Sequence, residues 1–173
     1  MTDTVIALIV TMVFSAFFSG MEIAFVSSNR LLAEMDTSGS PSQRAISFFY
    51  RHPNNFVSTM LVGNNIALVI YGILFAKIFD ATLFSSLGDG ERVTADTILS
   101  TVVVLFTGEF LPKTICKSNP NTMLSFFAIP AMVFYIVLYP ISRFATFLSR
   151  AMLFMVGGKM EKQKEGAGFT RVE

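Results

Sequence analysis

Four apolar stretches, each about the length needed to cross a lipid bilayer, dominate this chain. A helix needs about 20 mostly apolar residues to span the hydrocarbon core. Residues 4–26, 56–79, 95–115 and 123–142 meet this requirement. With a hydrophobic content of 53% and a mean hydropathy of +0.61, they indicate an integral membrane protein. Backbone polar groups in lipid must be paired within the segment, so the stretches predict an all-α membrane protein.

The distribution of lysine and arginine favours three crossings over four. Cytoplasmic flanks of membrane helices are enriched in basic residues. With the N-terminus outside and crossings at about residues 4–27, 54–79 and 95–116, only Lys77 and Arg92 of the 13 basic residues lie outside. A fourth crossing would move all the C-terminal basic residues outside. The sequence therefore predicts a multi-pass protein of the cytoplasmic (inner) membrane, with its N-terminus outside and its C-terminus cytoplasmic.

Two further segments are expected at the cytoplasmic face. Residues 30–52 contain a Ser-Gly-Ser-Pro turn and a short amphipathic stretch, which predict a juxtamembrane helical hairpin. Residues 121–156 are too apolar for water, but Pro130 and Pro140 are expected to break them into pieces of about half a span each. We expect these pieces to form a bent juxtamembrane belt. A fourth membrane-spanning helix is the alternative.

The two ends of the chain differ in character. The N-terminus enters apolar sequence with no preceding Lys or Arg, which predicts a retained membrane helix rather than a cleaved signal peptide. Residues 157–173 are polar and glycine-rich and predict a flexible linker toward a cytoplasmic domain outside this chain. The predicted organisation is a transmembrane domain over residues 1–156 followed by this linker.

Polar side chains inside the predicted crossing helices suggest a functional site, because such groups are costly at bilayer depth. From a rise of about 1.5 Å per residue, Ser19 and Asn64 each lie about 12 Å from the cytoplasmic ends of their helices. Glu109 lies within about two turns of that level. The candidates are Ser15, Ser19 and Glu22 in the first helix, Asn64 and Asn65 in the second, and Gly108 and Glu109 in the third.

Pro112 adds a backbone oxygen to this set. A proline has no N–H to donate and crowds the carbonyl four residues back, so we expect the Gly108 carbonyl to be free beside the Glu109 carboxylate. Hydroxyl, amide, carboxylate and carbonyl oxygens suit Mg²⁺ or Ca²⁺ and argue against zinc or copper. The predicted metal ligands are Ser15, Ser19, Asn64, Gly108 and Glu109, with Glu22, Asn65, Pro112 and Lys113 as secondary or gating residues.

Each of these groups also has a purely structural interpretation. Membrane serines commonly bond to their own helix backbone, a buried Asn pair can join two helices, and Gly20 and Gly63 can allow close packing. Glu109 is the hardest to explain in this way, since a membrane carboxylate without a cation or a lysine partner should be protonated. Lys113, one turn later, is a candidate for that partner.

Several other functions find no support in the sequence. A net charge of +1 offers no broad surface for a polyanion, so no nucleic-acid partner is expected. His52 is the only histidine and lies outside the crossing segments, and Cys116 is the only cysteine. The sequence contains no phosphate-binding glycine-rich loop, and we expect no enzyme activity.

Three motifs resemble those of the cyclin M/CorC family of magnesium transporters. "LFTGEFLPKT" is similar to the family's Gly-Glu-x-x-Pro-Lys-Thr signature, and "FSAFFSGMEIAF" is similar to the Ser-Gly-x-Glu-x-Ala motif of the bacterial first helix. "LVGNN" is similar to the Gly-Asn-Asn of the second helix. The motifs occur in the family's order, and the resemblance covers about residues 4–156. Departures at Met21, Ile23 and residues 110–111 remove no predicted ligand.

The resemblance implies three crossing helices with a juxtamembrane belt in the lipid bilayer, a homodimer, and a downstream cytoplasmic CBS-pair domain that binds ATP-Mg. It also implies that Ser15, Ser19, Asn64 and Glu109 coordinate Mg²⁺ on a transport path. The predicted function is Mg²⁺ transport, in the direction of efflux, with Na⁺ as a candidate coupling ion. The alternative is a membrane scaffold or assembly module whose polar cluster only locks helices together.

Overall fold

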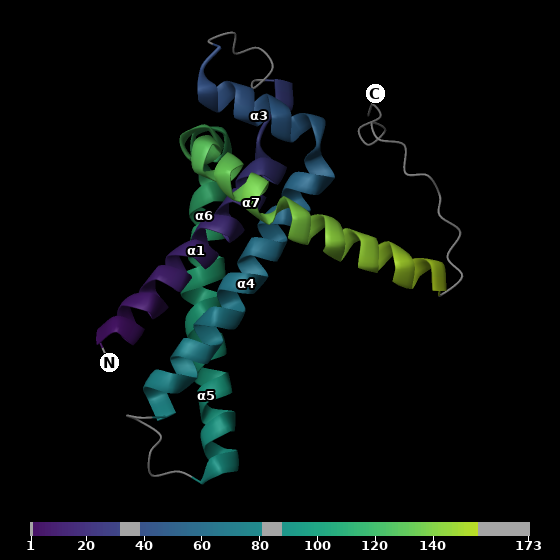
Figure 1. The fold of residues 1–173 in the computed structure, drawn as a ribbon. Coiled ribbons are helices and arrows are strands. Elements are labelled where there is room, and N and C mark those ends of the chain that lie inside the picture. Colours follow the sequence, from purple (N-terminus) through teal and green to yellow (C-terminus); the bar gives the residue numbers. More distant parts are fainter. Residues whose placement is uncertain (1, 32–38, 81–87, 156–173) are drawn as a thin grey trace, which may run out of the picture.

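The structure is a bundle of helices, and it confirms the all-α prediction for the part of the chain that it describes (Figure 1). The computed structural model describes residues 2–31, 39–80 and 88–155, and no strand occurs among them. The predicted linker at 157–173 lies outside these residues. The helices are α1 (Thr2–Ser27), α3 (Pro41–Arg51), α4 (Pro53–Asp80), α5 (Asp89–Val104), the π-helix η1 (Leu105–Phe110), α6 (Leu111–Ser118) and α7 (Pro120–Met155).

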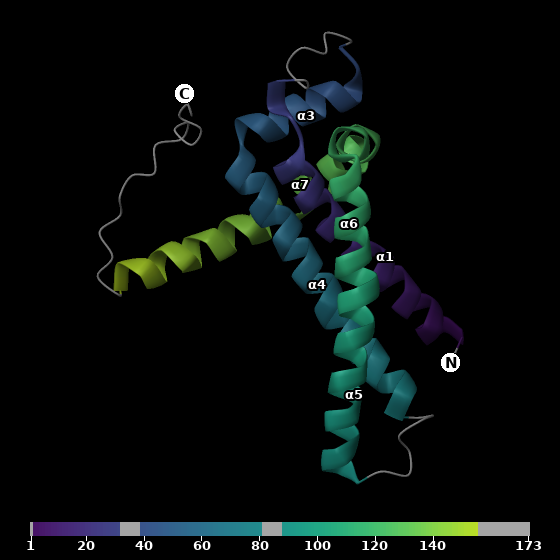
Figure 2. The same cartoon turned by 180° about the vertical axis from the view of Figure 1, so that it is seen from behind.

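The helices α1 and α4 and the continuous run α5–η1–α6 alternate in direction along the bundle. Figure 1 shows the C-terminal end of α1, the N-terminal end of α4 and the C-terminal end of α6 at the end where α3 lies. The view from behind shows the same arrangement (Figure 2). This alternation is the one expected for three successive membrane crossings.

Among the described residues, four helices are long and apolar enough to cross a membrane, whereas the sequence predicted three crossings. They are Thr2–Ser27, Pro53–Phe79, Gly90–Ser118 and Pro120–Phe144. The last segment is among these candidates because Pro130 and Pro140 do not break it, although a break was predicted: both lie inside the 36-residue helix α7. Proline is tolerated within apolar helices where local adjustments satisfy the carbonyl that loses its partner.

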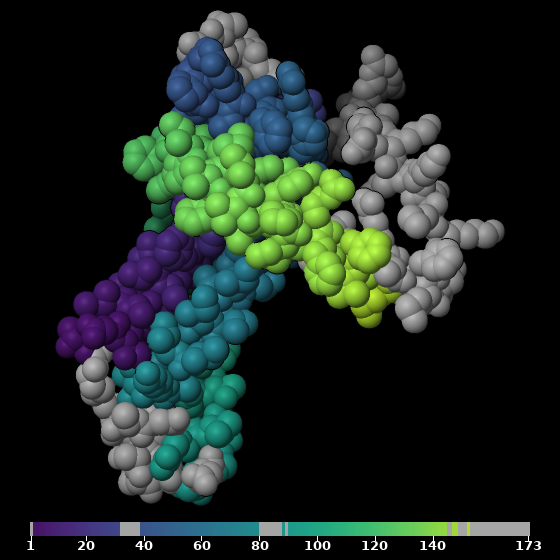
Figure 3. Space-filling model, viewed as in Figure 1, coloured from purple at the N-terminus to yellow at the C-terminus, as the bar shows by residue number. Residues whose placement is uncertain are grey.

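The direction of α7 changes along its length, which agrees with the predicted bend although not with the predicted break. Figures 1 and 2 show its first part nearly end-on and its second part running sideways from the bundle. The space-filling view shows α7 lying across α1 and α4 (Figure 3). A straight helix of this length would measure about 54 Å, well beyond a hydrocarbon core of about 30 Å. The juxtamembrane belt remains a prediction.

The short helix α3 begins at a strong local signal. Gly39 has a φ of +65°, which turns the chain, and Ser40 Oγ then accepts a hydrogen bond from the Gln43 N–H at 3.2 Å. Pro41 occupies the first helical position, where its missing N–H costs nothing. A short helix after a turn was predicted within residues 30–52, and the structure has it at Pro41–Arg51. Residues 32–38 lie outside the described part, and the juxtamembrane hairpin stays a prediction.

The hydrophobic core lies where α1, α3, α4 and α7 meet, near one end of the bundle. Aromatic rings dominate it: the Phe49 and Phe56 ring centroids lie 4.2 Å apart, and those of Phe25 and Phe56 lie 4.7 Å apart. Leu124 and Tyr135 bring α7 into the same cluster. Burial of these side chains fixes α3 across the bundle end and seats the first half of α7 beside α1 and α4.

Candidate functional site

Polar groups predicted from three different helices meet at one point. Ser15 Oγ on α1 donates a hydrogen bond to Asn64 Oδ1 on α4 at 2.8 Å, and both side chains are buried. Gly108 on η1 is also buried, and a Cβ atom added there would lie 3.2 Å from Ser15 Oγ. A hydroxyl that donates one hydrogen bond keeps its lone pairs, so both oxygens retain acceptor capacity. Three of the five predicted ligands are therefore neighbours.

Ser19 lies one turn after Ser15 on the same face of α1, and its hydroxyl is unsatisfied. The side chain is fully buried, and its Oγ has no hydrogen-bond partner in the described part of the chain. By contrast, the hydroxyls of Thr59 and Thr107 donate to carbonyls one turn earlier, at 2.7 and 2.6 Å. An unpaired buried hydroxyl costs about 1–3 kcal/mol. The usual structural role of a membrane serine therefore does not account for Ser19.

Two glycines let the helices approach closely at this level. A Cβ atom added at Gly63 would lie 2.7 Å from the Phe18 ring, and one added at Gly20 would lie 2.7 Å from Cys116 Sγ. Real Cβ atoms are not found at such distances, so a side chain at Gly63 would have to displace the Phe18 ring and one at Gly20 would have to displace the Cys116 thiol. The close-packing role that the sequence allowed for these glycines is confirmed, and it is what brings the polar groups together.

The segment that carries Gly108 and Glu109 is π-helical, a feature that the sequence reasoning missed. The Leu111 N–H donates to the Phe106 carbonyl, five residues back. Pro112 lies in the first turn of α6, just after the π-helical segment has ended. Single π turns within α-helices occur frequently at functional sites. A proline inside an apolar run was the sequence signal for this segment.

The π-helical hydrogen bonding changes the argument that the Gly108 carbonyl is a metal ligand. The prediction that the Gly108 carbonyl is free assumed an α-helical pattern, in which Pro112 faces the carbonyl four residues back. The bond from Leu111 to Phe106 shows a five-residue pattern just before the proline. The Gly108 carbonyl consequently stays a predicted ligand, supported by the closeness of the Gly108 residue to Ser15 rather than by the proline.

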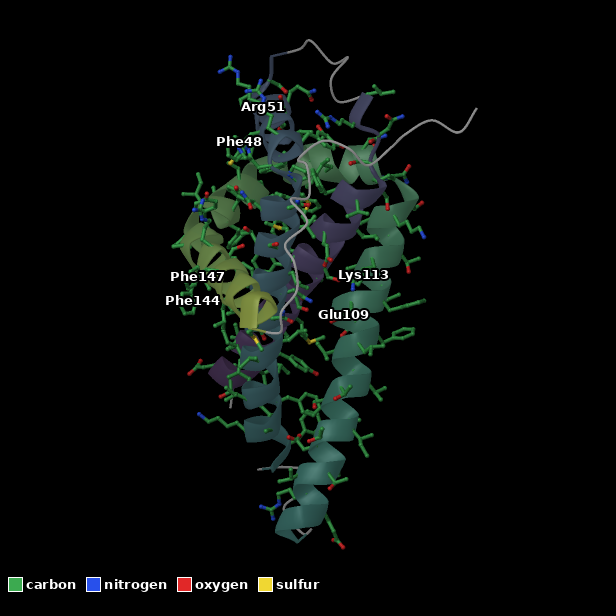
Figure 4. The ribbon with its side chains drawn as sticks, turned by 90° about the vertical axis from the view of Figure 1, so that its right-hand side faces the viewer. Phe48, Arg51, Glu109, Lys113, Phe144 and Phe147 are labelled. Atoms are coloured by element: carbon green, nitrogen blue, oxygen red, sulfur yellow. The ribbon has the colours of Figure 1, made fainter. Side chains whose placement is uncertain are left out.

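Glu109 pairs with Lys113. The Glu109 Oε2 and Lys113 Nζ atoms lie 3.6 Å apart, with side chains 31% and 41% exposed. Figure 4 shows the two residues one turn apart on the same helix. Among the described residues, Glu109 makes no hydrogen bond to Ser15, Ser19 or Asn64. The lysine partner that the sequence suggested is therefore present, and the carboxylate is not joined to the buried oxygens.

The remaining candidates lie outside the cluster. Asn65 is exposed, because it follows Asn64 and projects from a different side of α4, and Glu22 is half-buried on α1. Within residues 2–31, 39–80 and 88–155, no three His, Cys, Asp or Glu side chains gather in a way that could hold a metal. The possible ligand atoms that do come together are hydroxyl and amide oxygens, with one carboxylate on the adjoining turn. Such a set fits a hard cation better than a transition metal.

Comparisons with known proteins give a consistent result. The model of the cyclin M transmembrane N-terminal domain matches residues 5–173. The chain is 30% identical over 151 residues to the UPF0053 inner membrane protein YfjD of Escherichia coli (strain K12), covering 85% of this chain and 33% of that protein. It is 27% identical over 165 residues to a UPF0053 protein of Haemophilus influenzae, covering 92% of this chain and 37% of that protein.

A plant protein is also similar. The chain is 28% identical over 149 residues to a chloroplastic DUF21 domain-containing protein of Arabidopsis thaliana, covering 84% of this chain and 21% of that protein. The chain thus spans between 21% and 37% of the length of these three relatives.

Proposed function

Because the chain belongs to the family of cyclin M transmembrane N-terminal domains, we propose that it transports Mg²⁺ through the oxygen cluster of α1, α4 and η1. The chain is a multi-pass membrane domain of a type linked to membrane transport. The observation that carries the Mg²⁺ proposal is the buried, unpartnered Ser19 hydroxyl, one turn from the Ser15–Asn64 pair. A dehydrating cation would use that oxygen, whereas a merely structural cluster would leave it unsatisfied.

The roles follow from the chemistry of each group. Ser15, Ser19 and Asn64 offer neutral oxygens that replace part of the hydration shell, and Glu109 neutralises charge once it turns from Lys113. Mg²⁺ favours octahedral geometry at about 2.0–2.1 Å and dehydrates reluctantly, so we expect it to keep several waters here. The exposed Asn65 and the half-buried Glu22 are proposed as secondary groups along the path rather than as ligands.

The finer parts of the proposal rest on the family resemblance. These are efflux from the cytoplasm across the inner membrane, Na⁺ as a coupling ion, a homodimer, and a downstream CBS-pair domain that binds ATP-Mg. The N-out, C-in orientation rests instead on the distribution of basic residues.

A scaffold or assembly module is the second candidate. The Ser15–Asn64 hydrogen bond and the Glu109–Lys113 ion pair are both complete without a cation, and each can hold helical turns in place. On this reading the polar groups serve only helix packing.

A cation titration of the Ser19→Ala variant separates the two. Thermal unfolding of the purified protein is followed with Mg²⁺, and with Ca²⁺ and Na⁺ for comparison. For the wild type we expect Mg²⁺ to raise the unfolding temperature, since ligand at 100 times its Kd stabilises by about 2.7 kcal/mol. For Ser19→Ala we expect equal or higher stability without Mg²⁺, because an unpaired hydroxyl is removed, and a smaller response to Mg²⁺.

Ser47→Ala is the matched control, because Ser47 is exposed on α3. Its response to Mg²⁺ should equal that of the wild type. If Ser19→Ala responds to Mg²⁺ like Ser47→Ala, the Ser19 hydroxyl is not a ligand. If neither the wild type nor the variants respond to any cation, the result favours the scaffold.

A second prediction concerns Lys113, which competes with the cation for Glu109. Replacing it with glutamine leaves the carboxylate available, and we expect Mg²⁺ affinity to rise. Exposed ion pairs contribute about 0.2–1 kcal/mol, so the rise should be at most about fivefold. The measurement is the Mg²⁺ concentration at half-maximal thermal shift. Lys117→Gln, one turn further along α6, is the control; equal midpoints in both variants would show that Lys113 does not compete.

A further inference from the structure

One side of α3 carries an exposed row of basic and aromatic residues. Arg44, Phe48 and Arg51 follow one another at i, i+4 and i+7, and all three are exposed. The opposite side of this helix, with Ile46 and Phe49, is buried in the core. Because the burial of that side fixes how α3 is rotated, the basic row is held outward by the fold.

Aromatic contacts connect this row to α7. The Phe48 ring lies edge-on to Tyr135, with centroids 5.5 Å apart, and the Tyr135 and Tyr139 rings are also 5.5 Å apart. Tyr139 Oη then accepts a hydrogen bond from Arg143 Nη1 at 2.9 Å. A continuous path of side chains therefore runs from Phe48 to an anchored guanidinium on α7.

Beyond Arg143, α7 presents large apolar side chains. Phe144 and Phe147 are 66% and 67% exposed. Figure 4 shows them on the left of the view, as Phe48 is, but further along the bundle than Phe48 and Arg51. Exposed apolar surface of this kind marks contact with a membrane or a partner. We name the basic–aromatic face as Arg44, Phe48 and Arg51 of α3 together with Arg143, Phe144 and Phe147 of α7.

The position of α3 along the chain sets its depth in the membrane. The preceding candidate span ends at Ser27, and Arg51 comes two residues before Pro53, where the next span begins. A short helix between two such spans lies at the membrane surface, whichever side faces the cytoplasm. The contact between Phe48 and Tyr135 keeps the first half of α7 close to this level.

The charges of this face are all of one sign. The sequences of α3 and α7 contain Arg44, Arg51, Arg143 and Arg150 but no Asp or Glu. Guanidinium groups bind phosphate oxygens with two parallel hydrogen bonds, and basic helices with aromatic side chains lie in the headgroup layer. We propose that the basic–aromatic face binds anionic phospholipids, with Arg44, Arg51 and Arg143 on the phosphates and the three phenylalanines between the acyl chains.

The test measures binding of fluorescent phosphatidylglycerol and phosphatidylcholine to the detergent-purified chain. We expect the wild type to bind phosphatidylglycerol more tightly than phosphatidylcholine. An Arg44→Gln/Arg51→Gln double variant should bind phosphatidylglycerol about 25-fold more weakly, at about fivefold per arginine near an anionic lipid surface. Its binding of phosphatidylcholine, whose headgroup has no net charge, should weaken much less, and inorganic phosphate should not displace the bound lipid.

Two further variants keep the test decisive. Lys77→Gln/Arg92→Gln removes the same charge at the opposite end of the bundle and should bind like the wild type. Arg44→Lys/Arg51→Lys keeps the charge and should retain most of the binding. Equal loss in both glutamine variants would overturn the proposal in favour of overall charge. Unchanged lipid binding in Arg44→Gln/Arg51→Gln, with a smaller assembly by light scattering, would overturn it in favour of a second copy on this face.

Discussion

The Glu109→Gln variant is expected to lose most of its Mg²⁺ binding and its Mg²⁺ transport. Glutamine keeps the size and one oxygen of the side chain but removes the only carboxylate on the turn beside Ser15 and Asn64. Interactions that involve a charged group contribute about 1.5–3 kcal/mol, which corresponds to a loss of affinity of about 10- to 150-fold. The measurements are the Mg²⁺-dependent thermal shift and Mg²⁺ flux from proteoliposomes.

The control for this experiment is Glu91→Gln. Glu91 is an exposed carboxylate near the start of α5, on the same continuous helix, so the chemical change is identical and the location is not. We expect it to bind and transport like the wild type. Full transport by Glu109→Gln would contradict the assignment of Glu109 and would favour the scaffold, in which a near-isostere is tolerated.

Replacing Gly63 with alanine is expected to destabilise the whole bundle. The new methyl group would lie 2.7–2.8 Å from three atoms of the Phe18 ring. That ring cannot turn aside, because Phe17 and Phe134 pack against it with centroids 5.4 and 5.2 Å away. Overpacking of this kind costs about 1–3 kcal/mol. Unfolding of the protein in detergent by a chemical denaturant should therefore require less denaturant.

Gly72, also on α4, supplies a control variant that is expected not to lose stability. A Cβ atom at Gly72 would meet no atom within 4 Å, so Gly72→Ala adds no clash. Alanine also costs less backbone entropy than glycine in a helix, by roughly 0.5–1 kcal/mol. We expect this variant to be as stable as the wild type or more stable. Equal stabilities for the two alanine variants would show that the α1–α4 contact yields to the methyl group.

Most of the helical architecture was predictable from the sequence, because a membrane helix is determined by the length and polarity of its own segment. The helices at Thr2–Ser27 and Pro53–Asp80 begin and end close to their predicted bounds. The segment with Pro130 and Pro140 was predicted to break and does not, because its course depends on more than its own sequence. Whether a proline breaks a helix or only bends it depends on packing against other helices, which a single segment does not contain.

The candidate site was predicted in part. Ser19 and Asn64 were expected at the same depth from counting residues along each helix, and the structure joins Asn64 to Ser15, one turn before Ser19. The π turn at Leu105–Phe110 was not predicted, since its register depends on how α1 packs against Gly108. The exposure of Asn65 depends on the rotation of α4 about its axis, which the core aromatic residues determine. Depth is a local property of a membrane helix, whereas rotation is a property of the bundle.

The length and placement of α7 make it a lever, held in the core at one end and projecting from the bundle at the other. Its first half is wedged into the core through Leu124, Ala128 and Tyr135, while its second half projects from the bundle. From Tyr135 to Met155 the lever is about 30 Å long, so a tilt of about 10° in the core displaces its tip by about 5 Å. Small rearrangements among α1, α4 and α7 would therefore be amplified at Met155, and a force applied there would act on the core with the same leverage.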